Sequence, residues 1–329
     1  MKEIISSDYS IWIGEKSLSK INVKSHSKVA ILVDENTKIN CLKKIPKIDQ
    51  AIIIEIQSGE ENKNLKTCNY IWEKLTNHKF DRHSLLINLG GGVIGDIGGF
   101  CASTYKRGIN FIHIPTTLLA MTDAAIGGKL GVDFNNLKNH IGVFSNPKSV
   151  IINPTFLVTL EENQLKSGFS EIVKHALISD INLWEIIKDS DFTKLNLEEI
   201  IAYSVKVKNK IILTDPIEIG ERKKLNFGHT FGHAIESYYL AKGTPILHGE
   251  AVFMGMILEA EISNLSDSEK NEIKHYILSN FRLPYTPKKA ELLNFLRNDK
   301  KNKFKKINFS LLEGIGNCSI DNLLTEDEL

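Results

Sequence analysis

The chain has 329 residues, which is too long for one ordinary hydrophobic core and fits two domains, or one large α/β unit with a helical partner. Hydrophobic residues make up 42% and charged residues 25%, as in an ordinary soluble enzyme. Because the formal net charge is only +1, no overall field draws the chain to nucleic acid or to a membrane surface, and any anion-binding surface must be local.

The first half of the chain alternates short β-like runs with helical spacing. Near-continuous apolar runs are typical of strands buried on both faces of a parallel sheet. They predict strands at residues 28–33, 51–56, 84–89 and 110–114. Helical periodicity between them predicts a helix over residues 62–77. This alternation predicts a Rossmann-like, doubly wound parallel sheet with right-handed connections.

The second half has a different character, because strand signals fade from about Leu160 and helical periodicity dominates. Helices are predicted at residues 161–179, 197–213, 228–240 and 249–265. The pair Asn153-Pro154 marks a turn, so we place a domain boundary there. The expected organisation is an α/β domain over residues 1–153 and a helical domain over residues 154–329.

Cysteine usage and apolar runs indicate a cytoplasmic protein. The four cysteines are scattered without a C-x-x-C pair, so we expect reduced thiols and no thiolate metal site. The N-terminal residues show no signal-peptide pattern, and the apolar runs are far too short to cross a bilayer. We therefore expect no membrane partner.

A glycine-rich turn follows the predicted strand 84–89. Gly90, Gly92 and Gly95 satisfy G-x-G-x-x-G, whose glycines let backbone N–H groups approach a pyrophosphate at a helix N-terminus. The acidic residue expected about 20 positions later is missing, so a simple packing turn stays an alternative. Thr116 and Thr117 end the next strand at the edge where open α/β sheets bind ligands, although turn or capping roles would also explain them.

Histidines in the second half suggest a metal site. His229 and His233 are spaced i, i+4 on one helical face, and His248 and Glu171 offer two further ligands. Imidazoles and a carboxylate suit Zn²⁺ or a similar divalent ion with a position left open for substrate. Glu171 and Lys174, spaced i, i+3, would alone be interpreted as a surface ion pair.

Cations in loops form a second pattern. They lie at residues 106–108, 127–129 and 137–140, and Lys208 and Arg222 flank Asp215. Each one alone is more simply a solvated side chain. Their joint placement around the glycine and histidine motifs indicates an anionic substrate.

Taken together, these motifs resemble the 3-dehydroquinate synthase family. The matching segments are residues 90–99, 105–108, 114–120, 123, 127–129, 138–139, 170–174, 226–233 and 248–250, in family order. The resemblance implies a lyase that uses NAD and one divalent metal, Zn or Co. It implies that residues 1–153 form an NAD-binding domain, that residues 154–329 form a metal- and substrate-binding domain, and that the active site lies between them. It implies conversion of 3-deoxy-D-arabino-heptulosonate 7-phosphate to 3-dehydroquinate and phosphate, the second step of the shikimate pathway. Transient oxidation, β-elimination of phosphate, reduction and aldol closure are the implied steps.

The resemblance also implies roles for individual residues. The metal ligands are Glu171, His229 and His248, whereas His233 contacts the substrate phosphate. Substrate contacts are Asp123, Lys129, Asn139, Lys174, Lys208, Arg222, Asn226, His233 and a lysine of residues 299–301. NAD is held by Asp34, Asn36, Ser58, Gly59, Glu60, Lys63, Gly91, Gly92, Val93, Ile94, Gly95, Asp96, Thr116, Thr117, Lys129, Lys138, Phe156, Leu157, Val158 and Thr159. Arg107 is expected to reach across a homodimer interface to the partner's phosphate pocket.

The chain departs from the family pattern at Leu130, where Thr is common, at Asp133, where Asn is common, and at Asp215-Pro216, where Asp-Glu is more usual. Sister cyclases that make inosose or valiolone skeletons are one alternative, but their loop after Asp123 usually lacks the Gly-Gly-Lys found here. A metal-dependent alcohol or glycerol dehydrogenase is another, although a simple polyol needs no such basic set. A nucleic-acid-binding protein using residues 300–306 is disfavoured by the neutral charge and few aromatics.

Overall fold

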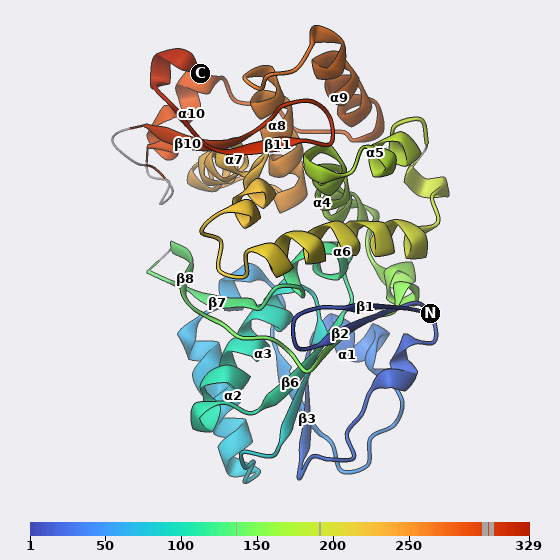
Figure 1. The fold of residues 1–329 in the computed structure, drawn as a ribbon. Coiled ribbons are helices and arrows are strands. Elements are labelled where there is room, and N and C mark those ends of the chain that lie inside the picture. The colour runs from blue at the N-terminus through green and yellow to red at the C-terminus, as the bar shows by residue number, and fades with distance from the viewer. Residues whose placement is uncertain (136, 191, 298–301, 303–305) are drawn as a thin grey trace. The chain divides into compact units, whose positions relative to one another are not determined.

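The structure is a computed structural model that describes residues 1–135, 137–190, 192–297, 302 and 306–329 (Figure 1). Its contacts divide the chain into two compact units, Met1–Glu161 and Glu162–Leu329. Each unit has a hydrophobic core of its own. All four cysteines are free, as the sequence predicts, and all four side chains are buried. Among the described residues, no helix combines the length and apolar character needed to span a membrane.

The N-terminal unit is built on a seven-stranded sheet with the order β1-β2-β9-β6-β5-β3-β4. Its strands are β1 (Lys2–Ile5), β2 (Ser10–Ile13), β3 (Val29–Asp34), β4 (Ile52–Ile56), β5 (Leu85–Gly90), β6 (Asn110–Pro115) and β9 (Ser149–Ile152). All neighbours are parallel except β1 and β2. The four strands predicted from apolar runs are β3 to β6, which confirms the α/β fold class. The helices of this unit are α1 (Glu35–Asn40), α2 (Leu65–Asn77) and α3 (Gly92–Thr104).

The order of the strands reverses at β3. After β3 the chain adds β4 on one side, and then crosses to add β5 on the other. In open α/β sheets, ligands bind at the carboxyl ends of the two strands that flank such a reversal. Asp34 ends β3 and Gly90 ends β5, so both residues lie at this position in the sheet.

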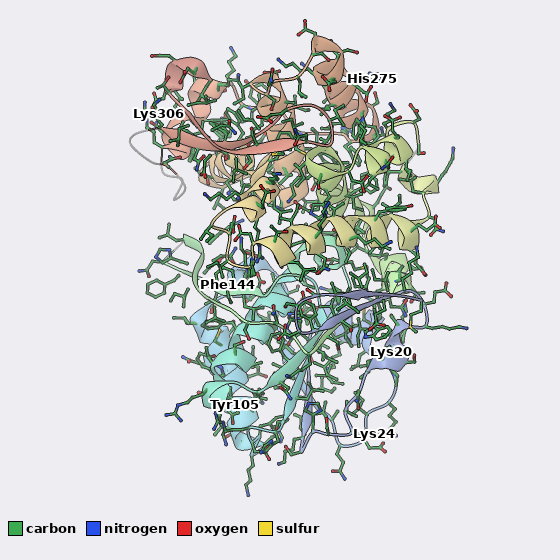
Figure 2. All side chains as sticks on the ribbon, viewed as in Figure 1. Lys20, Lys24, Tyr105, Phe144, His275 and Lys306 are labelled. Atoms are coloured by element: carbon green, nitrogen blue, oxygen red, sulfur yellow. The ribbon has the colours of Figure 1, made fainter. Side chains whose placement is uncertain are left out.

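A separate hairpin, β7 (Lys129–Phe134) with β8 (Leu137–Phe144), carries two of the basic motifs. The hairpin escapes sequence prediction because β8 is largely exposed and lacks a buried apolar face. Phe144, at its end and labelled in Figure 2, is 55% exposed.

The C-terminal unit is mainly helical. Its helices are α4 (Glu162–Ser179), α5 (Ile181–Lys188), α6 (Leu197–Thr214), α7 (His229–Ala241), α8 (His248–Glu261), α9 (Asp267–Asn280) and α10 (Lys289–Leu296). The four predicted helices are α4, α6, α7 and α8. A short 3₁₀ helix, η8 (Glu221–Asn226), precedes α7. The antiparallel pair β10 (Ile307–Leu312) and β11 (Cys318–Leu324) has no counterpart in the sequence prediction.

Candidate functional site

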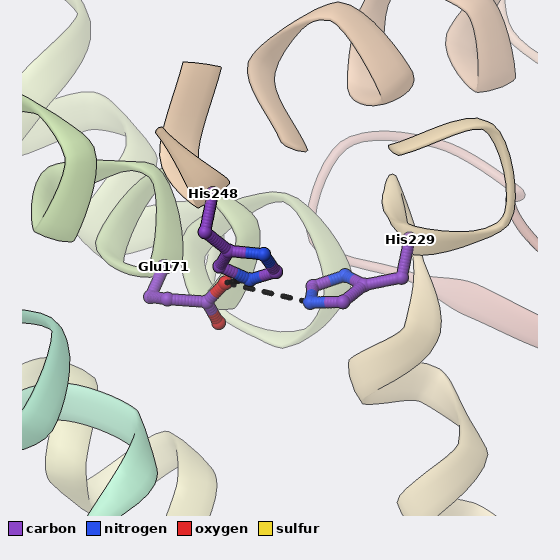
Figure 3. A group of neighbouring side chains, drawn as sticks. All are labelled: Glu171, His229 and His248. Carbon is purple, nitrogen blue, oxygen red and sulfur yellow. Dashed lines mark ion pairs between the residues drawn. The ribbon is translucent and has the colours of Figure 1, made fainter. Parts of the chain in front are cut away.

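Three side chains from different helices converge in the C-terminal unit. Glu171 lies on α4, and His229 and His248 are the first residues of α7 and α8 (Figure 3). One ligand atom of each lies within 4.8 Å of the others. The imidazole Nε2 atoms of His229 and His248 are 3.6 and 3.9 Å from Glu171 Oε1. These distances are too long for hydrogen bonds but suit donor atoms that each lie about 2 Å from one shared cation.

Close approaches at glycine bring these helices together. A Cβ added to Gly249 of α8 would lie 2.0 Å from the carbonyl oxygen of Ser167 on α4. A Cβ on Gly255 would lie 2.0 Å from the carbonyl oxygen of Gly228, just before α7. Since any side chain at these positions would force the helices apart, the glycines allow the three ligand atoms to meet.

Hydrogen bonds orient both imidazoles. Nδ1 of His229 is 3.1 Å from the carbonyl oxygen of Phe227, which can only accept, so Nδ1 carries the proton and Nε2 presents a lone pair. Nδ1 of His248 is 3.2 Å from the Glu236 carboxylate. Carboxylate and carbonyl partners of this kind fix the imidazole tautomer in metal sites.

Burial, followed by the charge of Lys174, lowers the pKa of His229 well below its ordinary value, which favours the neutral ligand form. Burial also opposes the charged form of His248, but Glu236 and Glu171 outweigh it and raise the pKa of that imidazole. The surroundings therefore favour the neutral form of His229 and the charged form of His248, although both residues direct Nε2 toward Glu171.

The environment of Glu171 fits a bound cation. Its side chain is fully buried, and within the described part of the chain neither carboxylate oxygen accepts a well-aligned hydrogen bond. Lys174, also buried, forms an ion pair with Oε2. The interpretation of Glu171 and Lys174 as a surface pair is therefore wrong. A buried carboxylate with acceptor capacity left over, facing two imidazole lone pairs, is chemically suited to a divalent ion.

His233 lies outside the cluster of ligand atoms. Its ring centroid is 5.4 Å from that of His229, and its side chain is exposed. Of the three histidines singled out in the sequence, the structure groups only His229 and His248 with Glu171.

Buried cations accompany this cluster in the same unit. Lys174, Lys208 on α6 and Arg222 on η8 are between 1% and 4% exposed. For Lys208 and Arg222 the interpretation as solvated side chains is therefore wrong. Asn226, at the end of η8, donates from Nδ2 to Glu218 at 2.7 Å. The lysines of residues 299–301 lie outside the described residues.

Asp215 builds the loop that holds Arg222, and the departure from the family pattern is the Pro216 that follows it. The Asp215 carboxylate accepts backbone hydrogen bonds from Ile219, Gly220 and Arg222 at 2.7 to 3.1 Å. The Arg222 guanidinium donates to the carbonyl oxygen of Pro216. Burial would raise the pKa of Asp215, but these N–H groups and Arg222 lower it below its ordinary value.

Replacing Asp215 with asparagine is expected to destabilise the C-terminal unit by about 1–3 kcal/mol at neutral pH, because charge-assisted hydrogen bonds are lost. Since the folded-state pKa of Asp215 is depressed, its contribution is complete above the ordinary value of 3.8 and is lost as the pH falls through the lowered pKa. Denaturant unfolding at several pH values tests this. A stability difference that persists unchanged in strong acid would contradict it.

In the N-terminal unit, the glycine turn forms the start of α3. Gly91 is the N-cap residue and, as a glycine, has no side chain with which to cap this end of the helix. The backbone N–H of Thr116 donates to Gly90 O at 3.0 Å, and a Cβ on Gly91 would lie 3.1 Å from Thr117. Backbone N–H groups at such a helix start, with both threonines beside them, form a cradle suited to a pyrophosphate.

Other predicted nucleotide-site residues surround this edge of the sheet. Lys63, 4% exposed, forms a 2.6 Å ion pair with Asp96 on α3. The pKa of Asp96 is raised to about 6, because the effect of burial exceeds the opposing effect of the Lys63 charge. Asp34 caps α1 by accepting from the Thr37 backbone at 2.7 Å. Ser58 donates to Glu35.

The remaining predicted contacts of the N-terminal unit differ in exposure. Phe156 and Leu157 are buried, and Val158 is 84% exposed. Exposed side chains belong to Asn36, Glu60, Arg107, Lys129, Lys138 and Asn139. Asp123 is half-buried in a π-helical turn, Ala120–Ala124.

Two departures from the family pattern have structural roles. Leu130 is 5% exposed in the core of the N-terminal unit, where it packs so tightly on α3 that a Cβ on Gly99 would lie 2.5 Å from it. Asp133 accepts from the Asn139 backbone at 2.7 Å, and its own N–H donates to Lys63 O at 2.8 Å. Asp133 thus links the β7–β8 hairpin to the segment that carries Lys63.

Sequence reasoning missed two acidic residues near the histidines: Glu236, which pairs with His248, and Glu259, which accepts from backbone N–H groups on either side of His229. His229, His233 and Glu236 are spaced i, i+4 and i+7, so all three lie on one helical face. This spacing could have indicated from the sequence that Glu236 lies near the histidines. Glu259 is a lone charge within the apolar stretch 251–260 of α8, which was a second signal.

Two family models match adjacent parts of the chain. The 3-dehydroquinate synthase N-terminal model matches residues 53–167, and the C-terminal model matches residues 168–302. A 3-dehydroquinate synthase of Parabacteroides distasonis is 40% identical over 316 residues, covering 92% of this chain and 90% of the relative. One from Prochlorococcus marinus is 40% identical over 338 residues, covering 96% and 90%.

Solved structures agree on the fold. A 2-deoxy-scyllo-inosose synthase complexed with carbaglucose-6-phosphate, NAD⁺ and Co²⁺ superposes with a TM-score of 0.86 at 25% identity, covering 99% of this chain and 97% of the other. A 2-epi-5-epi-valiolone synthase from Streptomyces hygroscopicus, with NAD⁺ and Zn²⁺ bound, gives 0.87 at 24% identity, covering 100% and 96%. Matching family models over both units, and relatives at 40% identity across nine-tenths of the chain, establish that it belongs to the 3-dehydroquinate synthase family.

Proposed function

We propose that this chain catalyses the 3-dehydroquinate synthase reaction, converting 3-deoxy-D-arabino-heptulosonate 7-phosphate to 3-dehydroquinate and phosphate. The observation that carries the proposal is the convergence of Glu171, His229 and His248, with buried Lys174 beside them, in a chain of this family. An anionic substrate explains why so many cations are buried in a protein of nearly neutral charge.

NAD and one divalent metal are the proposed cofactors. The solved cyclases that share the fold contain NAD⁺ with Co²⁺ or Zn²⁺, and both ions suit two imidazoles and a carboxylate. When bound, the metal would supply Lewis acidity toward the substrate hydroxyl oxygens, and NAD⁺ would accept and return a hydride. Glu171, His229 and His248 would hold the metal. The glycine turn at the start of α3 would hold the NAD pyrophosphate.

The chain's own residues would bind and orient the substrate. Arg222 and Lys208 would hold its carboxylate, the arginine by a bidentate pair. His233, Lys129 and Asn139 would position the phosphate, so that the substrate's own phosphate takes the proton during elimination. Asp123, Lys174 and Asn226 are further proposed contacts.

The comparisons favour this reaction over the alternatives. Identity to 3-dehydroquinate synthases is 40%, against 25% to the inosose synthase. The family match also favours a cyclase over an alcohol or glycerol dehydrogenase. Most of the lysine-rich segment 300–306 lies outside the described residues.

The proposal also assigns NAD to the first domain and the metal to the second. It further includes a homodimer whose interface Arg107 crosses, a cytoplasmic location and a role in the shikimate pathway. Arg107 is exposed, which is compatible with this interface role.

Phosphate release tests the proposed function. Purified, metal-loaded protein with catalytic NAD⁺ is expected to release phosphate from the heptulosonate phosphate without accumulating NADH, because the hydride is returned in each turnover. A phosphate assay and absorbance at the NADH band measure both. Net NADH formation from glycerol, with no phosphate released from the sugar acid, would refute the proposal.

A further inference from the structure

Helix α7, which begins with His229, has no capping side chain at its own N-cap position. That position is Gly228, whose φ of +78° favours glycine. A Cβ there would lie 2.5 Å from the Met256 side chain and 3.2 Å from the Val252 carbonyl oxygen. The close approach of α8 therefore excludes the Ser, Thr, Asp or Asn that caps most helices.

A carboxylate from α8 takes over this role. Glu259 Oε2 accepts from the backbone N–H of Gly228 at 2.6 Å, and Oε1 accepts from that of Phe231 at 3.0 Å. The Glu259 side chain is fully buried. An anionic acceptor at a helix N-terminus is stabilised both by the hydrogen bonds and by the helix dipole.

We infer that Glu259 is a positioning residue for the metal centre. Its two hydrogen bonds span Gly228 to Phe231 and so enclose His229 in the turn between them. The ring of His229 is bonded to the carbonyl oxygen of Phe227, immediately before this turn. The direction of His229 Nε2 toward Glu171 is therefore set by a turn that Glu259 anchors.

Glu259 acts on the metal only through this turn. Its carboxylate does not belong to the group of ligand atoms formed by Glu171, His229 and His248. Because metal sites tolerate ligand displacements of only about 0.5 Å, loosening the turn would weaken binding without removing a ligand. This inference rests on the proposed metal centre.

Glu259→Gln tests the inference. The amide keeps the shape but replaces one acceptor with an NH₂ group that faces a backbone N–H. We expect metal affinity, measured by competition with a chelator, to fall about 10- to 100-fold, as for other supporting partners of metal ligands. The visible absorption spectrum of the cobalt-loaded protein is expected to change, and amide exchange at Gly228 and Phe231 to quicken.

Glu269→Gln is a matched control. Glu269 also accepts backbone hydrogen bonds at a helix start, from Ser266 at 2.9 Å before α9 and from Ile315 at 3.3 Å. Its replacement is expected to lower thermal stability while leaving metal affinity and the cobalt spectrum unchanged.

A Glu259→Gln protein with lower stability but unchanged metal affinity and cobalt spectrum would overturn the inference, because the residue would then be only structural. Should that variant not fold, Glu259→Asp keeps the charge but is one methylene shorter. It is expected to bind metal less tightly than the unaltered protein, and equal affinity would overturn the inference. Absence of metal binding by the unaltered protein would instead refute the proposed metal centre.

Discussion

Replacement of His229 with alanine is expected to remove the metal and the phosphate-releasing activity together. Two of three ligands, Glu171 and His248, would remain, which is too few for tight binding of a divalent ion. We expect metal affinity to fall by more than about 100-fold, beyond the effect of losing an outer partner. Elemental analysis of the purified variant and a phosphate assay measure both quantities.

Two other histidines serve as controls for this prediction. His275 lies on the outside of α9 and is exposed (Figure 2), so His275→Ala is expected to keep both metal and activity. His233→Ala is expected to keep the metal but to lose activity, because His233 is outside the ligand group. Stoichiometric metal in the His229→Ala protein would refute the ligand role of that residue.

Replacement of Arg222 with lysine is expected to weaken substrate binding. A guanidinium pairs with a carboxylate through two parallel hydrogen bonds, whereas an ammonium is a point charge without that fork. Losing one charged hydrogen bond costs about 1.5–3 kcal/mol, which corresponds to roughly a 10- to 150-fold rise in KM. Steady-state kinetics with the sugar acid measure this rise.

The chain offers a matched arginine for comparison. Arg297 pairs with Glu326 through two hydrogen bonds, of 2.6 and 2.7 Å, on the protein surface. Arg297→Lys breaks a similar fork outside the proposed site, so KM is expected to stay unchanged. If KM and kcat of the Arg222→Lys enzyme equal those of the unaltered enzyme, the carboxylate assignment is wrong.

The main elements of both units could be predicted from the sequence, because their signals are local. Apolar runs marked β3 to β6, and helical periodicity marked α2, α4, α6, α7 and α8. Strands β1, β2 and β9, helices α1, α5, α9 and α10, the hairpin β7–β8 and the pair β10–β11 were missed. Strand β8 is mostly exposed, and β11 has no fully buried face, so neither carries a strong apolar pattern.

The candidate site, like the fold, was only partly predictable from the sequence. The i, i+4 spacing of His229 and His233 is visible in the sequence, but spacing alone could not show that only His229 belongs to the ligand group. The resemblance to the family supplied that distinction. The structure gives it a geometric form, since His229 and His248 direct Nε2 toward Glu171 whereas His233 lies outside the group.

The sequence by itself determined the order of the elements, the glycine turn and the residue types available to a metal and to an anion. Only the tertiary structure decided which of these side chains meet. The close approaches at Gly249 and Gly255, and the capping of α7 by Glu259, join segments far apart in the chain. Such contacts depend on how helices pack, and packing is a property of several segments together that no single stretch of residues encodes.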